Sequence, residues 1–315
     1  MPEEYTPQFP NVVDNSMLVT FRACPRKWFY QYALGLRPRG SKIDLVAGAA
    51  FAAACEHVRR GVYERKLSME DALQAALPHF MREWGDTETP SHSPKTFNRM
   101  WEAVQLYFKH HNPLTDVVQP IFVNDKCSAE WTISLELPFK HPITNEPIIY
   151  GGRFDLLGKY KDEAMVIVDE KTTKQFGDSW ARQWSVRSQF MGYSWAMQQS
   201  GYNVNMVMVR GIGIMKTDIR FQTAMTTFNQ STIDRWYEAT LRDLDRMLNY
   251  WEQHHADTFH RGYHAAYGDA CTSYGMCPFS TPCTSNDPTR WLSEYEQQFW
   301  NPLAKMPIAD NNPSP

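Results

Sequence analysis

Long hydrophobic runs are missing from this sequence, although 43% of its 315 residues are hydrophobic. No uninterrupted apolar stretch approaches the roughly 20 residues that cross a bilayer, which argues against a membrane-spanning protein. The N-terminal residues have neither the basic start nor the apolar core of a secretory signal, so we expect a cytoplasmic protein. The GxxxxGK(S/T) loop of nucleotide-driven motors is missing as well, which excludes a helicase that translocates by itself.

Cysteine is scarce, with six residues in the chain. Without a secretory signal, so few cysteines do not indicate a disulfide framework. Cys55 and Cys127 stand alone in the sequence, which is typical of buried thiols. By contrast, Cys271, Cys277 and Cys283 form a cluster with five residues in each gap. This cluster indicates a site that uses thiol chemistry.

The charge balance is slightly acidic overall, at a formal net charge of −3. The charges are uneven, however. Residues 22–66 contain ten Lys and Arg residues against three Asp and Glu residues. A local basic surface can hold phosphate groups even when the whole protein is acidic. An ordinary solvated surface explains the same charges equally well, so charge alone leaves nucleic-acid binding open.

The hydrophobic pattern predicts helices in the first third of the chain. We expect a helix over residues 16–36, interrupted by Pro25, and further helices over 45–65, 68–84 and 97–110. Ser68 followed three residues later by Asp71 resembles a capping box at the start of the third helix.

The pattern then changes to that of a sheet. Residues 117–160 alternate polar and apolar, which predicts an antiparallel meander, and the apolar stretch 165–172 predicts a strand at the centre of the sheet. A helix over 184–199, strands over 203–214 and 219–228, and a long helix over 231–252 follow. This order indicates an α/β fold with a helical insertion at 57–115.

Two carboxylates and a lysine form the candidate catalytic set. Asp155 ends the stretch GGRFD, and Asp169 and Lys171 lie fourteen and sixteen positions later, after a turn at 161–163 and a second strand. Neighbouring strands lie about 5 Å apart, so both carboxylates can meet at one edge of the sheet. Side chains alternate along a strand, so Asp169 and Lys171 share a face and Glu170 points away.

Phosphodiester hydrolysis needs a hard cation held by oxygen ligands and a group that positions water. Asp155 and Asp169 can hold Mg²⁺ or Mn²⁺, and Lys171 can orient the attacking water and stabilise negative charge on the phosphate. A surface ion pair on an edge strand is the alternative interpretation. The apolar residues before Asp169 favour a functional site over that alternative.

A second polar pair lies downstream. The spacing of four residues places Gln189 and Tyr193 on one face of a helix. Their amide and phenol groups can contact the bases or backbone of DNA. Two polar groups on an ordinary helix surface would have the same spacing.

The GxxD, DxK and QxxxY series, in this order, resembles the RecB-like nucleases of the PD-(D/E)XK superfamily, including the AddB-type and CRISPR-associated Cas4-like nucleases and phage-encoded relatives. The stretch CPRKWFY at residues 24–30, preceded by Ser16, resembles their opening motif. The resemblance covers most of the chain. It implies a central mixed sheet flanked by helices, DNA cleavage with Mg²⁺ or Mn²⁺, and the Glu170 carbonyl as a third metal ligand.

One position departs from this family. Its helix of the form GxxxHxxxE supplies a histidine as metal ligand, but the matching stretch, residues 48–56, has Ala52 there. At about 100° per residue, Glu56 lies roughly 40° from Ala52 around the helix, whereas His57 lies roughly 140° away. We therefore expect Glu56 to be the substitute in the active site and His57 to lie at the surface.

The resemblance also gives the clustered cysteines a function. Three clustered cysteines and the distant Cys24 resemble the iron–sulfur nucleases of this group, in which the cluster connects the two ends of the chain. Four thiolates suit either a [4Fe–4S] cluster or zinc. Zinc sites usually pair their ligands as CxxC, and no such pair is present. This cluster would place Arg26 and Lys27 beside the path of DNA.

Together these features predict a single nuclease domain over 1–315, with the insertion at 57–115, a cluster-binding segment at 260–290 and a C-terminal tail at 291–315. The predicted activity is a Mg²⁺- or Mn²⁺-dependent deoxyribonuclease, an exonuclease acting on DNA ends or single strands, in recombination or repair. A separate helicase or recombination protein is the expected partner. The alternative is a catalytically weak or inactive DNA-binding accessory protein that keeps the fold.

Overall fold

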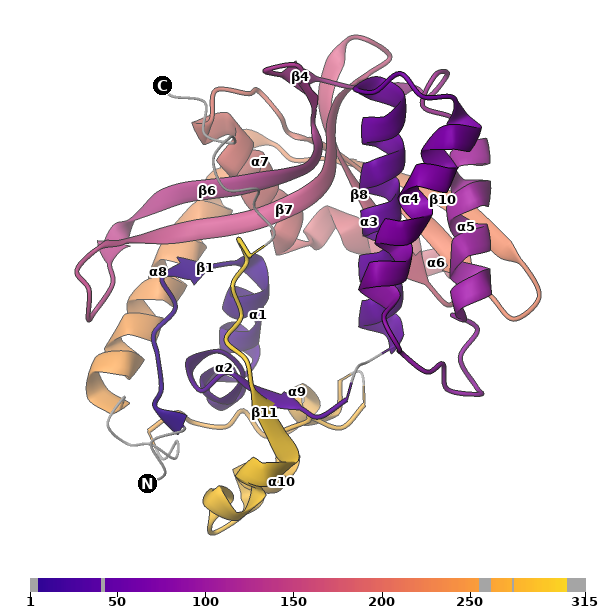
Figure 1. Cartoon of the computed structure of the whole chain (residues 1–315). Coiled ribbons are helices and arrows are strands. Elements are labelled where there is room, and N and C mark those ends of the chain that lie inside the picture. Colours follow the sequence, from indigo (N-terminus) through magenta and orange to yellow (C-terminus); the bar gives the residue numbers. More distant parts are fainter. Residues whose placement is uncertain (1–4, 41–42, 255–261, 274, 305–315) are drawn as a thin grey trace. The chain divides into compact units, whose positions relative to one another are not determined.

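The computed structural model describes residues 5–40, 43–254, 262–273 and 275–304 (Figure 1). The chain forms two compact units, each assembled from separate segments. The first unit contains Met1–Gly40, Thr132–Gly152 and Asp234–Pro315, and the second contains Ser41–Trp131 and Arg153–Ile233. All the residues predicted to hold a divalent metal belong to the second unit, and the four predicted cluster cysteines belong to the first.

The second unit is built on a mixed sheet in which β7, β8, β9 and β10 are neighbours in that order. Strand β8 runs antiparallel to β7 and parallel to β9, and β10 runs antiparallel to β9. The strands are β7 (Pro147–Tyr160), β8 (Ala164–Thr173), β9 (Met206–Ile214) and β10 (Ile219–Thr227), and the short β3 (Val118–Pro120) pairs with β7. The predicted α/β class with a central mixed sheet is therefore confirmed.

Strand β8 occupies the centre of this sheet, as its apolar sequence predicts. Val166, Ile167 and Val168 are completely buried, since both faces of the strand are covered. The turn that connects β7 to β8 contains Lys161 and Asp162 with φ of 50° and 61°. Two consecutive positive φ angles are typical of the tight hairpin turns that match the twist of the strands, so the predicted turn is also confirmed.

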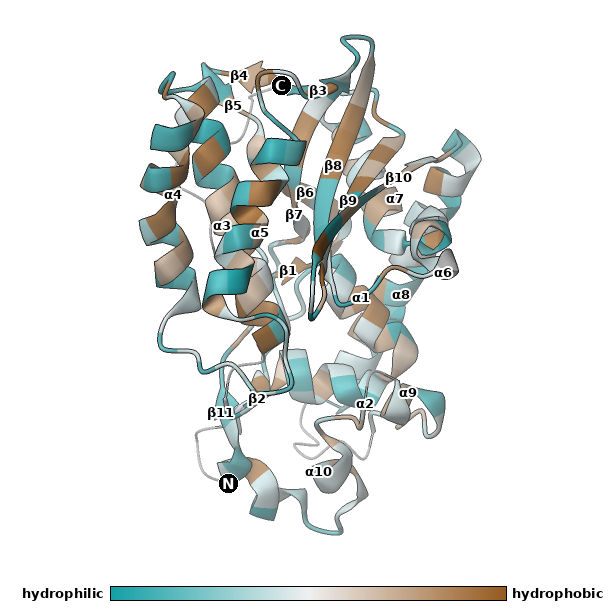
Figure 2. Cartoon of the chain, turned by 90° about the vertical axis from the view of Figure 1, so that its right-hand side faces the viewer, coloured by the Kyte–Doolittle hydropathy of each residue, from teal (hydrophilic) through white to brown (hydrophobic). Residues whose placement is uncertain are grey.

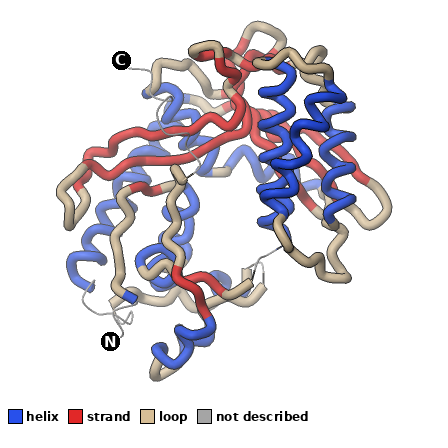
Figure 3. The backbone as a smooth tube through the Cα atoms, viewed as in Figure 1, coloured by secondary structure: helices blue, strands red, loops and turns tan. Residues whose placement is uncertain are grey.

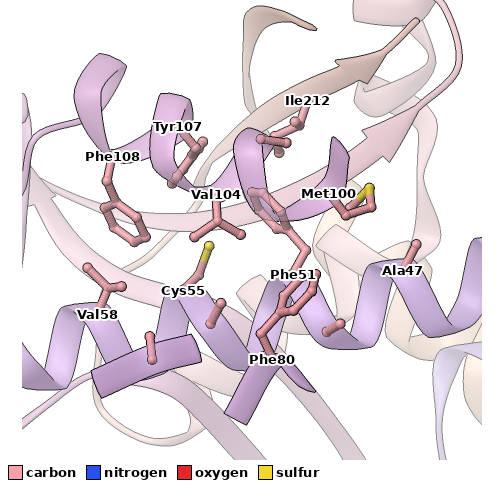
Figure 4. Close-up of a cluster of buried hydrophobic side chains, with 14 of the residues drawn as sticks. Ala47, Phe51, Cys55, Val58, Phe80, Met100, Val104, Tyr107, Phe108 and Ile212 are labelled. Carbon is pink, nitrogen blue, oxygen red and sulfur yellow. The ribbon is translucent and has the colours of Figure 1, made fainter. Parts of the chain in front are cut away.

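Three helices cover one face of strands β8 to β10, as Figure 2 shows. They are α3 (Ile43–Tyr63), α4 (Met69–Trp84) and α5 (Phe97–His110), close to the predicted ranges. The Ser68 hydroxyl caps α4 by accepting from the Asp71 amide at 3.1 Å, as predicted. Figure 4 shows their shared core, in which Phe51, Phe80 and Val104 pack with Ile212 of β9.

The opposite face is covered by α6 (Asp178–Arg182) and α7 (Ser188–Gln199), which lie on the other side of the sheet in Figure 2. The predicted helix over 184–199 is divided, because Arg187 has extended backbone angles. Its first residues form a separate 3-10 turn, Gln183–Val186. Buried Phe190 and Tyr193 of α7 provide its contact with the unit's interior, where Tyr193 meets the ring of Phe154 at 5.4 Å between centroids.

The first unit contains residues 132–152 of a long hairpin formed by β6 (Ala129–Lys140) and β7, drawn in red in Figure 3. Strand β1 (Val12–Val13) pairs in parallel with Ile149 and Tyr150 of β7. The other elements are α1 (Asn15–Ala23), α2 (Pro25–Trp28), a π-helical turn (Phe29–Ala33), β2 (Leu36–Pro38), most of α8 (Gln230–His254), α9 (Asp269–Thr272), α10 (Ser280–Thr284), a 3-10 helix (Pro288–Glu294) and β11 (Tyr295–Gln297).

The N-terminal helix is interrupted at Cys24, one residue before the predicted break. Cys24 has extended backbone angles, and Pro25 begins the next helix at a position where its missing N–H costs nothing. The bend at Cys24 is therefore followed directly by a short helical segment, α2 and the π-helical turn. In the described ranges, no helix has the length and apolar character needed to cross a membrane.

Candidate active site

The antiparallel pairing of β7 with β8 brings Asp155 and Asp169 into adjacent positions. Leu156 of β7 is registered with Val168 of β8, so the next pair along this antiparallel ladder brings the two aspartates together. The main-chain amide of Glu170 donates a hydrogen bond to the Asp155 carboxylate. The structure thus places the two carboxylates at one position on the sheet, as the strand spacing predicts. That the two carboxylates bind a metal ion remains a prediction.

Alternation along β8 separates Lys171 and Glu170 as expected. Lys171 forms an ion pair with Asp169, while the Glu170 carboxylate is bound from the helical side by Arg59 and Tyr107. The Asp169 side chain is 3% exposed and that of Lys171 is 34% exposed. The lysine therefore extends from a buried carboxylate toward solvent, where a phosphate group can reach it.

Negative charge is concentrated at this position. Burial, followed by the charge of Asp169, raises the pKa of Asp155 well above its usual range. Burial also raises the pKa of Asp169, against the opposing effect of Lys171. Burial by itself would lower the pKa of Lys171, but Asp169 and Asp155 outweigh it and raise that pKa. Lys171 therefore stays positively charged beside two carboxylates, and its single charge cannot neutralise both of them.

A divalent cation is the chemical group that such carboxylates accept, because hard cations prefer oxygen ligands. Within the described ranges, no three His, Cys, Asp or Glu side chains lie close enough together to hold a metal ion. Two carboxylates with a backbone carbonyl and water remain compatible with that finding. Asp155 and Asp169 with the Glu170 carbonyl therefore fit the predicted donor set.

Glu56, the predicted substitute for the missing histidine, pairs with Arg60 on its own helix at 2.9 Å and is 27% exposed. Its charge contributes to raising the pKa of Glu130, so it acts on the site electrostatically. The ring of His57 stacks on His79 of α4, at partial exposure. A direct catalytic role for Glu56 remains a prediction.

Gln189 and Tyr193 lie on one face of α7, as their spacing predicts. The Gln189 amide donates to the Tyr193 hydroxyl at 2.7 Å, and that hydroxyl donates to the Arg153 carbonyl oxygen at 2.6 Å. Tyr193 is buried. The pair thus connects α7 to β7 two residues before Asp155. These contacts are internal to the protein, and the predicted contacts with DNA remain a prediction.

Glu130 is a site residue that the sequence analysis missed. Its side chain is 10% exposed and pairs with Arg153 at 2.6 Å, and its φ of 55° lies in a region that side-chain-bearing residues rarely adopt. Burial raises the pKa of Glu130 to about 7, although Arg153 opposes the shift. The charge of Glu130 in turn contributes to raising the pKa of Asp155. The alternation of polar and apolar residues in the stretch SAEW, residues 128–131, does not indicate that this carboxylate is buried.

The four predicted cluster cysteines belong to the first unit, where they line one cavity of about 450 Å³. The lining includes Cys24, Cys271, Cys277 and Cys283 together with Arg26 and Lys27. Residues up to almost 260 positions apart in sequence therefore line a single cavity. The four thiols lie on its wall and are not gathered around one central point. The cavity could hold many atoms, since a water molecule occupies about 30 Å³ of liquid.

Arg26 is directed at this cavity. Its guanidinium donates to the Cys283 carbonyl at 3.3 Å and lies 3.6 Å from the Cys283 sulfur, and its Nε donates to the Tyr263 carbonyl at 2.9 Å. Burial raises the pKa of Cys277, and the positive charge of Lys27 opposes that rise, because a nearby cation favours the thiolate. The other two cysteines, Cys55 and Cys127, are buried in the second unit, which confirms their prediction as buried thiols.

No curated protein sequence matches the chain. Among solved structures, a provisionally named exonuclease from Eubacterium rectale is similar at 13% identity and a TM-score of 0.47, covering 76% of this chain and 80% of that one. The crystal structure of SSO0001 is similar at 11% identity and a TM-score of 0.31, covering 75% and 77%. These scores are too low to support an argument about function.

The family comparison is decisive because it covers most of the chain. The profile of the PD-(D/E)XK nuclease superfamily matches residues 15–284, a range that contains both aspartates, the lysine and all four cavity cysteines. Nucleases hydrolyse phosphodiester bonds of nucleic acids, and members of this superfamily generally use divalent metal ions. With the mixed sheet and the paired carboxylates at its edge, this match shows that the chain belongs to the PD-(D/E)XK nuclease superfamily.

Proposed function

We propose that this nuclease is a Mg²⁺- or Mn²⁺-dependent deoxyribonuclease. The observation that supports the proposal most directly is the adjacency of Asp155 and Asp169 on the paired strands β7 and β8, with Lys171 bound to Asp169. In this proposal Asp155, Asp169 and the Glu170 carbonyl hold the metal ion. When bound, the ion would polarise the phosphate and lower the pKa of a water molecule.

Lys171 supplies the remaining charge. Its ammonium group is held cationic by Asp169 and Asp155, so it can orient the attacking water and stabilise negative charge on a non-bridging phosphate oxygen. Lys171 is part of β8, where its backbone is paired with Gly211 of β9, so its backbone position is fixed by the sheet. Gln189 and Tyr193 support the arrangement from α7 by holding β7 just before Asp155, and Gln189 could also contact the substrate.

We further propose that the cysteine-lined cavity holds a [4Fe–4S] cluster, with zinc as the alternative occupant. Four thiols around one cavity, without a CxxC pair, are the support for this choice. The group would be structural, because joining residues nearly 250 positions apart removes much conformational freedom from the unfolded chain. Iron and zinc content of anaerobically purified protein distinguishes the two, with about four irons per chain expected. Cys24→Ser should lose the metal and Cys55→Ser should keep it.

Exonuclease action on DNA ends or single strands is the proposed mode of cleavage, on the strength of the motif resemblance. Purified protein with Mg²⁺ or Mn²⁺ should degrade linear single-stranded or double-stranded DNA and leave covalently closed circles intact. Cleavage of the circles would show endonuclease activity instead. The double variant Asp155→Ala, Lys171→Ala should be inactive on every substrate, and surviving cleavage would show that the mechanism is wrong.

A DNA-binding accessory protein with weak or no activity is the second candidate. It is favoured by Ala52 at the position of the family's histidine and by the pairing of Glu56 with Arg60. In that case, purified protein would bind DNA in a gel-shift assay but leave end-labelled strands uncut at every metal concentration. A helicase or recombination partner is expected under either candidate, because the chain carries no motor motif of its own.

A further inference from the structure

Behind the proposed metal site lies a buried polar cluster that joins two helices to β8. Arg59 of α3 and Tyr107 of α5 both bind the Glu170 carboxylate. Arg59 also donates to the Tyr107 hydroxyl at 3.2 Å. These three side chains, which we call the Glu170 clamp, are contributed by elements more than 40 residues apart in sequence.

The clamp is closed off from solvent and compensated in charge. The side chains of Arg59 and Glu170 are 4% and 3% exposed, and Tyr107 is fully buried. Next to them, Arg210 of β9 donates to the Tyr107 hydroxyl at 3.3 Å and binds both oxygens of Asp116 at 2.8 and 2.6 Å. Glu170 and Asp116 thus each have an arginine partner.

Such a cluster is not explained by stability alone. Desolvation of buried ions offsets much of their attraction, so apolar residues of similar volume often stabilise a fold equally well. What a buried ion pair does provide is a single geometry for the groups that it binds, because any displacement leaves a buried charge without a partner. The position of the clamp is therefore informative.

Glu170 is the residue between Asp169 and Lys171. Its side chain is held by the clamp on one face of β8, its amide donates to the Asp155 carboxylate, and its carbonyl is the proposed third metal ligand. Fixing the side chain therefore fixes the peptide units on both sides of it. Arg59 also neutralises a carboxylate whose charge would otherwise add to those of Asp155 and Asp169, since like charges at short distance oppose each other's ionisation.

We propose that Arg59 and Tyr107 are positioning residues of the nuclease active site, which hold Glu170 so that Asp155, Asp169 and the Glu170 carbonyl keep the arrangement required by the metal ion. This inference rests on the proposed metal-dependent activity and extends it: Arg59 and Tyr107, which lie in the segment 57–115 predicted as an insertion, would belong to the catalytic apparatus. The role resembles that of outer-shell partners in metal sites generally, which orient the ligands that touch the ion.

The test uses the full-length protein and two matched tyrosine variants. Tyr107→Phe removes one hydroxyl from the clamp and leaves the ring in the core. Tyr63→Phe removes a hydroxyl from α3 that donates to the Pro113 carbonyl at 2.7 Å and to the Gln119 side chain at 3.5 Å, neither of which belongs to β8. Two experiments are done on each variant. Calorimetry gives the Mn²⁺ affinity without DNA, and steady-state assays over a Mn²⁺ titration give kcat and KM on linear DNA.

Loss of outer-shell partners typically lowers metal affinity or activity about 10- to 100-fold. Tyr107→Phe should therefore weaken Mn²⁺ binding and lower kcat by about tenfold or more with KM for DNA unchanged, while Tyr63→Phe stays within about twofold of wild type. Equal effects of the two variants on Mn²⁺ affinity would show that Tyr107 is only structural and overturn the proposal.

Arg59→Lys provides a second variant, in case the loss of the Tyr107 hydroxyl prevents folding. A lysine keeps the charge but not the planar fork that binds two partners, so Mn²⁺ affinity should fall while the protein stays folded by circular dichroism. Unchanged affinity in Arg59→Lys overturns the proposal. If wild-type protein neither binds Mn²⁺ nor cuts DNA, the proposed function fails and the positioning role fails with it. If wild-type protein cuts DNA but Tyr107→Phe and Tyr63→Phe have the same Mn²⁺ affinity, the positioning role alone fails.

Discussion

The main-chain amide of Glu170 donates a hydrogen bond to the Asp155 carboxylate, which joins the end of β8 to the neighbouring strand β7. The bond orients Asp155 through the backbone of the residue that follows Asp169. One proposed metal ligand, Asp155, is thus positioned by the peptide unit that joins the residues supplying the other two, Asp169 and Glu170. The site is preorganised by the sheet itself, so substitutions at Asp155 should affect metal binding without rearranging the strands.

Asp155→Asn should abolish cleavage while preserving the fold. The substitution keeps the size of the side chain but removes the charge that holds a hard cation. We expect the rate to fall by more than the roughly 100-fold that outer-shell substitutions cost, with weaker Mn²⁺ binding. The control is Asp162→Asn in the β7–β8 turn, where φ is 61° and asparagine is well tolerated. A rate for Asp155→Asn within a few fold of the control would exclude Asp155 as a metal ligand.

Tyr193→Phe separates a supporting role from direct contact with DNA. The variant loses the hydroxyl that donates to the Arg153 carbonyl, so β7 is less well held just before Asp155. Loss of an intramolecular hydrogen bond of this kind costs about 0.5–1.5 kcal/mol of stability. We expect kcat to fall and KM for DNA to stay constant in steady-state assays. A rise in KM with unchanged kcat would instead indicate that Tyr193 touches the substrate.

Glu130 should make the metal-free protein less stable as pH rises. Its pKa is about 7 in the folded protein, above the value of 4.5 that it has when exposed, so the folded state binds the proton more tightly than the unfolded state. Stability is then greatest below about 4.5 and falls as pH rises through 7, by no more than about 3 kcal/mol at 1.36 kcal/mol per pKa unit.

Glu130→Gln removes this dependence. In urea unfolding without metal, the free energy of unfolding of Glu130→Gln should increase relative to that of wild type as the pH rises from 5 to 8. Glu136→Gln, at an exposed position on the same strand, serves as the control and should track wild type. A difference between Glu130→Gln and wild type that is constant with pH would contradict the assignment of a buried, proton-holding carboxylate.

Arg26→Gln should alter the metal cluster more than it alters DNA binding. The Arg26 guanidinium lies 3.6 Å from the Cys283 sulfur, and hydrogen bonds to the sulfurs tune the potential and persistence of iron–sulfur clusters. We expect faster loss of iron in air and a shifted reduction potential, with unchanged DNA affinity. Arg37→Gln is the control, because Arg37 binds Gln298 in the same unit and does not line the cavity. An intact cluster with weakened DNA binding would support the DNA contact predicted from the sequence.

The sequence by itself determined the elements of this protein and the local geometry of its site. Strand alternation places Asp169 and Lys171 on one face and Glu170 on the other, because the period of two is a property of the backbone. The length of the strand–turn–strand segment brings Asp155 to Asp169 for the same reason. The cap at Ser68 and the buried centre of β8 also follow from short-range patterns, which is why these predictions were confirmed.

Only the tertiary structure decided which groups surround that site. Glu170 lies 111 positions from Arg59 and 63 from Tyr107, and nothing in the local sequence of either helix connects it to β8. The burial of Glu130 and the direction of Arg26 toward Cys283 are likewise long-range results. The physical reason is that periodicity fixes the face on which a side chain lies, whereas the partner of a buried charge depends on which distant element packs against that face.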